Sequence, residues 1–200
     1  MIPKVIHYIW IGNKEKPKQV IECINSWKKN LPDYEIKEWN ESNLDINKFK
    51  YSKVAYDNKM WGFVGDPLRI WILYEYGGIY LDTDVEVYKS FNDLLDDTLF
   101  VGAEQPHYFG NATIGAEKGN PILKEVLDVY ENKDFILKEN WWEYETGPMI
   151  LTDVLSKYVD RDSMEYQKNE VTVYPKKYFV NHEIKDNEVY CKHYMLGSWQ

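Results

Sequence analysis

Cysteine, long apolar runs and positive charge are all scarce in this chain of 200 residues. The two cysteines, Cys23 and Cys191, are far apart and form no Cys-x-x-Cys pair, which argues against a disulfide framework. We expect reduced thiols, with one long-range disulfide as the alternative. The apolar run at residues 5–11 is too short to span a bilayer and lacks a cleavage-site pattern. We therefore expect a soluble, cytoplasmic protein whose membrane contact, if any, is peripheral, at the inner face, or made through a lipid-linked substrate.

The charge balance argues against nucleic acid as a partner. Lysine and arginine total 24 against 33 acidic residues, for a net charge of −9, and no basic patch is present in the sequence. Aromatic residues are abundant, with 8 Trp and 17 Tyr. We expect most of them to fill the core, although aromatic faces also suit nucleobases and sugar rings.

Apolar periodicity and turn residues predict alternating strands and helices. We expect strands at residues 5–11, 34–39, 79–81, 85–88, 98–103, 111–116 and 171–180, and helices at 20–30, 66–76, 121–130 and 146–158. The polar stretch 40–51 is expected to be loop with a short helix. No repeat or linker divides the chain, so we predict one domain over residues 1–200, an α/β sandwich around a mostly parallel sheet.

Two carboxylates, Asp82 and Asp84, follow the predicted strand at 79–81 with only Thr83 between them. Two acids at the end of a buried strand are desolvated and repel each other unless a cation lies between them. In open α/β sheets this edge is also where ligands bind. The pair therefore predicts a divalent metal with a phosphorylated ligand.

Other chemistries share the Asp-x-Asp spacing. A calcium loop needs a glycine where Val87 stands, which excludes that interpretation. An aspartate-nucleophile phosphatase normally has a hydroxyl or apolar residue where Glu86 stands, so that alternative is disfavoured but open. A nucleotide-sugar site, in which the acids hold Mg²⁺ or Mn²⁺ against a diphosphate, fits the pattern. The alternative without a function is that the two acids lie in a solvated turn between two strands.

The helix before this strand carries a second polar pair. We predict that Asp66 caps the helix, that Pro67 is its first residue and that Gly77-Gly78 end it. Asp66 and Arg69 are three residues apart, hence on one helical face. Taken alone they predict a cap and a surface ion pair; beside the acidic pair they are candidates for handling the other end of the ligand.

These residues together resemble a known family. The run Asp66-x-x-Arg69 followed by Gly77-Gly78-x-Tyr80-x-Asp82-x-Asp84 resembles the DXD-containing sugar transferases of glycosyltransferase family 32 and the glucosylating domain of the large clostridial toxins. The opening IPKVIHYIWIG, the TGP at 146–148 and the closing HYMLGSW are similar to elements of the same family, so the resemblance spans nearly the whole chain.

The resemblance implies a GT-A fold, here a single α/β/α sandwich, and roles for individual residues. Asp84, Asp82 and His193 would hold Mn²⁺ or Mg²⁺, although the closing element has no acid where the toxin pattern has a Glu ligand. Asp66, Arg69 and Asp84 would be the catalytic residues. The donor-binding residues would be Trp10, stacked on the base, with Asp66, Arg69, Tyr80, Asp82, Asn111, Ser198 and Trp199.

The implied function is a metal-dependent, retaining glycosyltransferase. It would move a hexose from a nucleoside-diphosphate sugar, UDP-hexose being favoured, to a saccharide or lipid-linked saccharide in capsule or surface polysaccharide synthesis. No residue is evident as a nucleophile, which favours attack by the acceptor on the face the diphosphate leaves. The alternatives are an aspartate-nucleophile phosphatase and a non-catalytic sugar- or nucleotide-binding module.

Overall fold

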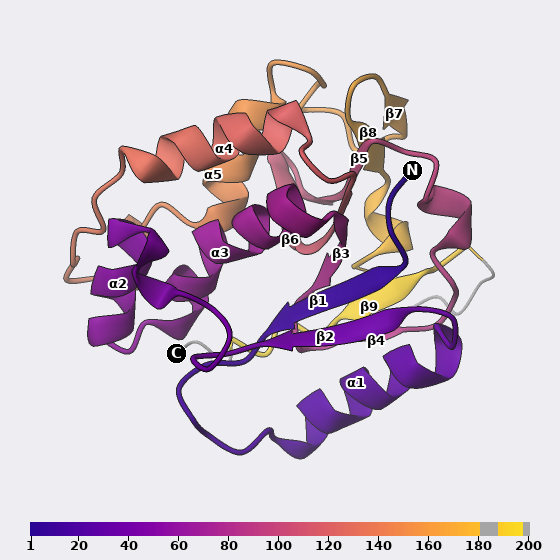
Figure 1. The fold of residues 1–200 in the computed structure, drawn as a ribbon. Helices are drawn as coiled ribbons and strands as arrows, with labels where there is room; N and C mark the ends of the chain where they lie inside the picture. Colours follow the sequence, from indigo (N-terminus) through magenta and orange to yellow (C-terminus); the bar gives the residue numbers. More distant parts are fainter. Residues whose placement is uncertain (181–187, 198–200) are drawn as a thin grey trace.

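The computed structural model describes residues 1–180 and 188–197, and a seven-stranded sheet forms the centre of this part (Figure 1). The strand order is β2-β1-β3-β6-β5-β8-β7. The strands are β1 Val5–Ile9, β2 Glu35–Trp39, β3 Gly78–Leu81, β5 Leu99–Gln105, β6 Tyr108–Ala116, β7 Gln167–Lys168 and β8 Thr172–Tyr174. Five of the seven run in one direction, because only β6 and β7 are antiparallel to their neighbours. The predicted mostly parallel sheet is confirmed.

Helices cover both faces of the sheet, as Figure 1 shows. They are α1 Lys18–Asn30, α2 Lys50–Asp57, α3 Trp61–Tyr76, α4 Pro121–Glu131 and α5 Gly147–Leu155. One buried cluster joins α2, α3, α4 and α5 to the sheet, and a second joins α1 to the other face. A two-stranded ladder of β4 Val85–Val87 and β9 Cys191–His193 packs into that second cluster. The α/β/α sandwich is therefore confirmed.

Helix α3 ends as predicted but begins earlier. Gly77 is its C-cap with φ +66°, and its N–H donates to the Leu73 carbonyl at 2.8 Å. The predicted start at Asp66 is wrong, because the helix begins at Trp61 and Pro67 lies inside it. The apolar residues Phe63 and Val64 are buried and extend the packed face of the helix toward its N-terminus. Asp66 is free of a capping role in its own helix.

Two further predictions need correction. The strand expected at 171–180 is only Thr172–Tyr174, since Pro175 lacks the N–H that a ladder needs and a 3₁₀ turn follows at Lys176–Tyr178. The stretch 40–51 does contain a short 3₁₀ helix at Ile46–Lys48, but α2 begins at its end and was not predicted. Cys23 and Cys191 are both buried free thiols, as expected. Among the described residues, no helix has the length and apolarity that a bilayer crossing needs.

Candidate functional site

The acidic pair lies where β3 passes into β4. Asp82 directly follows β3 and its N–H donates to the Ala112 carbonyl at 2.8 Å, so the sheet fixes its backbone. Asp84 precedes β4, whose ladder with β9 sets Val85 opposite His193. This register brings an imidazole from the far end of the chain to the two acids.

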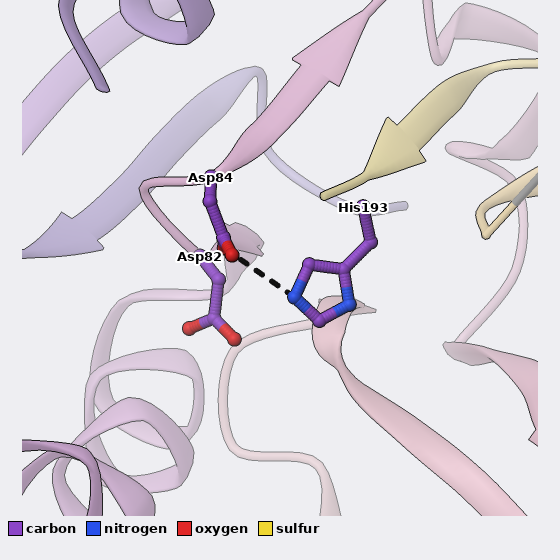
Figure 2. Close-up of side chains that lie close together, drawn as sticks. All are labelled: Asp82, Asp84 and His193. Carbon is purple, nitrogen blue, oxygen red and sulfur yellow. Dashed lines mark ion pairs between the residues drawn. The ribbon is translucent and has the colours of Figure 1, made fainter. Parts of the chain in front are cut away.

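The three side chains converge on one point (Figure 2). Asp82, Asp84 and His193 each offer a ligand atom, and these atoms lie within 4.8 Å of one another. His193 Nε2 is 3.3 Å from Asp84 Oδ1, and Asp84 is only 7 % exposed. In the part of the chain that the structure describes, His193 Nδ1 is buried without a hydrogen-bond partner. Two carboxylates with an imidazole nitrogen beside them fit a metal-binding centre.

Backbone from the C-terminal segment holds Asp84 in place. The Leu196 N–H donates to Asp84 Oδ2 at 2.9 Å, and the Tyr194 N–H donates to the Asp84 carbonyl at 3.0 Å. Burial opposes ionisation of Asp84, but the hydrogen bonds from His193 and Leu196 outweigh it and hold the pKa of the carboxyl below its usual value. Burial also favours the neutral His193 ring, yet Asp84 outweighs that effect and raises the pKa of the imidazole. The carboxylate is thus kept ionised, the form in which it binds a cation.

Arg69 links the helix to the acidic pair. It is 6 % exposed, and its Nη1 donates to Asp82 Oδ1 and to the Asn111 carbonyl, both at 2.9 Å. Its Nη2 is 3.3 Å from Asp66 Oδ1, and its guanidinium lies 4.8 Å from the centroid of the Tyr80 ring. A buried cation between two carboxylates fixes the orientation of both. The surface ion pair expected of these residues taken alone is therefore wrong, because the pair is buried.

Asp66 joins α3 to two elements distant in sequence. Its Oδ2 accepts from the Gly147 N–H at 3.0 Å, at the start of α5, and its Oδ1 accepts from Asn111 Nδ2 at 3.2 Å. Asp66 thus stabilises the N-terminus of α5 rather than that of its own helix. Burial raises the pKa of Asp66 to about 6, although Arg69 acts in the opposite direction. A carboxylate so buried is costly to keep charged, which is typical of functional sites.

The other predicted donor contacts are placed as follows. Asn111 lies within the site through Asp66 and Arg69, as described above. Tyr80 is buried under the Arg69 guanidinium. Trp10 is half-buried after β1, and its indole N–H donates to the Lys14 carbonyl at 2.8 Å. Ser198 and Trp199 lie outside the described residues, so their roles stay predictions.

Two residues of the site were not anticipated from the sequence. The Gly147 backbone lies so close to Asp66 and Asn111 that a Cβ on residue 147 would lie 2.4 Å from both Asp66 Oδ1 and Asn111 Nδ2. Glu104 on β5 is half-buried, and burial raises the pKa of its carboxyl, with His193 and Asp82 among the charges that act on it. The TGP motif could have indicated Gly147, but no sequence signal marks Glu104.

Comparison with known proteins finds relatives of the segment that carries the acidic pair. The family model described as "Glycosyltransferase sugar-binding region containing DXD motif" matches residues 17–101. Inositol phosphoceramide mannosyltransferase 3 of Schizosaccharomyces pombe is 27% identical over 214 residues, covering 99% of this chain and 60% of that protein. Lactosylceramide 4-alpha-galactosyltransferase of Mus musculus is 33% identical over 103 residues, covering 51% of this chain and 26% of that protein. The chain thus spans about 60% of the length of the yeast relative.

A solved structure is similar as well. The protein described as "PaToxG Glycosyltransferase" superposes with a TM-score of 0.61 at 25% identity, covering 78% of this chain and 69% of the other. The fold is an α/β sandwich of the GT-A type. The region that carries Asp82 and Asp84 is thus similar to the sugar-binding region of DXD-containing glycosyltransferases.

Proposed function

We propose that this protein is a retaining hexosyltransferase that uses a nucleoside-diphosphate sugar, with UDP-hexose the favoured donor. Its acceptor is a saccharide or lipid-linked saccharide, and its setting is capsule or surface polysaccharide synthesis in the cytoplasm, at the inner face of the membrane. The observation that carries the proposal is the junction of two groups: the Asp82, Asp84 and His193 cluster, and the buried Asp66–Arg69 pair joined to it through Asp82.

The residues at the cluster suit a divalent ion. Two carboxylates and one imidazole accommodate Mn²⁺ well, while Mg²⁺ prefers oxygen ligands alone. When bound by Asp82, Asp84 and His193, such an ion supplies Lewis acidity to the charge that develops on a departing diphosphate. The ionised Asp84 carboxylate accepts from the Leu196 N–H, and its backbone is held by Tyr194, so it provides a fixed negative ligand that does not need to reorganise.

In this proposal Asp66 and Arg69 bind the donor sugar. The two oxygens of Asp66 already accept hydrogen bonds from Gly147 and Asn111. The Arg69 guanidinium forms an ion pair with the same carboxylate and further restrains its orientation. A carboxylate restrained in this way orients hydroxyl groups and favours a positively charged sugar ring, but it is poorly placed to move toward an anomeric carbon. This supports attack by the acceptor on the face that the diphosphate leaves, with the departing phosphate taking the proton.

Donor turnover with product analysis tests the proposal. The protein is incubated with Mn²⁺ and a panel of UDP- and GDP-linked hexoses, and release of the diphosphate is measured with and without saccharide acceptors. We expect release with one donor class, and NMR of the product should show the donor's anomeric configuration. Asp128→Asn on the exposed face of α4 is the matched control for Asp84→Asn. An inverted product would reject retention, and absence of release with every donor would reject transfer.

The proposal also predicts how much activity is lost when Asp84 is replaced. We expect Asp84→Asn to keep less than about one per cent of activity, since loss of a metal-phosphate clamp costs several kcal/mol of transition-state stabilisation. The Asp128→Asn control should retain full activity. Equal activity of the two variants would contradict the role given to Asp84.

A further inference from the structure

An unusual group of exposed apolar side chains lies in the connection between α4 and α5. Ile136, Leu137, Trp141 and Trp142 are 63 %, 54 %, 63 % and 66 % exposed. Among the described residues, six large apolar side chains are more than half exposed, and these four are among them. We call residues 136–142 the Trp loop. Single exposed apolar residues are ordinary on protein surfaces, but a cluster of this kind marks an interaction surface.

The Trp loop is held in shape at both ends. Phe135 is buried and its ring stacks on Tyr144 with centroids 5.6 Å apart, while Phe63 packs on both rings. The Tyr144 hydroxyl accepts from the Lys138 N–H at 2.9 Å and so closes the loop on itself. The exposed side chains between these anchors are therefore presented to solvent by an ordered backbone.

Neighbouring ion pairs secure the same segment. Lys133 pairs with Glu145 across the base of the loop, and Lys50 of α2 pairs with Asp134 at 2.6 Å. In Figure 1 the connection between α4 and α5 runs beside α2, at the left edge of the view. These contacts leave the two indoles and the two aliphatic side chains on the outside of the loop.

The chemistry of the Trp loop favours a lipid surface over other partners. Sugar rings stack on indoles, but the exposed isoleucine and leucine offer a sugar neither hydrogen bonds nor an aromatic face. Aliphatic side chains with tryptophans suit the boundary between headgroups and acyl chains. Residues 132–146 carry two lysines and four acids, for a net charge of −2, so neither polyanions nor anionic lipids are favoured.

The loop also leads into the site. Only four residues separate Trp142 from Gly147, whose N–H is bonded to Asp66. An acceptor carried by a membrane lipid would thus meet the site when the Trp loop touches the bilayer. Two of the relatives described above are named for ceramide substrates, which agrees with a lipid-borne acceptor. This step rests on the proposed function.

We propose that the Trp loop docks the protein onto the interface of an electrically neutral lipid bilayer. The test is binding to vesicles of phosphatidylcholine, followed by sedimentation and by quenching of tryptophan fluorescence with brominated phosphatidylcholine. The variant is Trp141→Ser with Trp142→Ser. The matched control is Ile21→Ser with Val129→Ser, which removes two exposed apolar side chains from helices α1 and α4.

We expect the wild type and the control to bind vesicles equally at 0.1 and 0.5 M NaCl, and the Trp variant to bind at least tenfold more weakly with loss of quenching. Absence of wild-type binding, equal binding of the Trp variant, or binding that disappears with salt would overturn the proposal. So would a tryptophan-dependent dimer, or quenching by soluble saccharide without vesicle binding.

Failure of the docking proposal and failure of the proposed function are distinguishable. Diphosphate release from the donor in solution, with water or a soluble saccharide as acceptor, does not need the Trp loop and should be unchanged in the Trp variant. A protein that turns over donor but ignores vesicles would refute docking alone. A protein that binds vesicles through the Trp loop but never releases diphosphate would refute the transferase function alone.

Discussion

Replacing Arg69 with methionine removes the cation from between two carboxylates and keeps most of the side-chain volume. Arg69 is 6 % exposed and bonds to Asp82 and to the Asn111 carbonyl, with Asp66 3.3 Å away. Breaking a buried ion pair by removing one partner typically costs about 3–5 kcal/mol, because the other charge stays buried. For a chain of this size, that corresponds to a fall in melting temperature of roughly 6–20 °C.

The penalty should depend on pH in a definite direction. Burial already raises the pKa of Asp66 to about 6, and Arg69 opposes that rise. Without Arg69 the folded protein binds the proton on Asp66 more tightly than the unfolded chain does, so its stability falls as pH rises. We therefore expect Arg69→Met to be less destabilising at pH 5.5 than at pH 7.5.

Urea denaturation at both pH values measures this effect, and the chain supplies a matched control. Its other arginine, Arg161, pairs with Asp153 near the surface, where the side chains are 35 % and 61 % exposed. Arg161→Met should cost less than about 1 kcal/mol at either pH. If the two variants lost the same stability, or if the Arg69 penalty were larger at the lower pH, the electrostatic description of the site would be wrong.

Two further predictions concern the site and the core beneath it. Gly147→Ala places a methyl 2.4 Å from Asp66 Oδ1 and from Asn111 Nδ2, so donor turnover should fall roughly 100-fold, as happens when reacting groups are displaced; Gly65→Ala, whose Cβ comes no nearer than 3.6 Å to a neighbour, is the control and should stay active. Burial lowers the pKa of His7 to about 4, so stability should be lost as pH falls from about 6.5 toward 4, by at most about 3 kcal/mol. Urea denaturation at pH 7 and 4.5 should show that His7→Gln loses less stability between these pH values than the wild type does. An equal loss in the two proteins would contradict the role given to His7 in this pH dependence.

Local signals were sufficient for the centre of the site. Gly77 and Gly78 have φ values of +66° and +104°, and a Cβ on Gly78 would lie 2.7 Å from the Val5 carbonyl. Only glycine accommodates such a turn easily, which is why the end of α3 and the start of β3 were predictable. The position of Asp82 and Asp84 follows directly from that strand.

The remaining parts depend on contacts between distant segments. Asp66 before Pro67 is a common helix start, but its carboxylate accepts a hydrogen bond from Gly147 at the start of another helix. Nothing in the sequence around Asp66 indicates that partner. His193 was expected near the acids only through the family resemblance, and the structure places it there by pairing β9 with β4. Strand pairing of this kind is not encoded in local periodicity.

The exposed Trp loop could not have been predicted either. Its composition resembles that of other aromatic segments in the chain, such as α3, whose apolar residues are largely buried. The difference arises because Phe135 and Tyr144 occupy the available core positions beside Phe63.

The central claim, a metal-dependent nucleoside-diphosphate site at Asp82, Asp84 and His193, is tested most directly by thermal denaturation with Mn²⁺ and UDP, GDP, CDP or ADP. At one hundred times its dissociation constant a ligand adds about 2.7 kcal/mol of stability. For a domain of this size that is a rise of roughly 5–10 °C in melting temperature. We predict such a rise for one diphosphate class, dependent on Mn²⁺ and absent in Asp84→Asn. A rise that persists without metal or in Asp84→Asn, or no rise with any diphosphate, would contradict the assignment of this site.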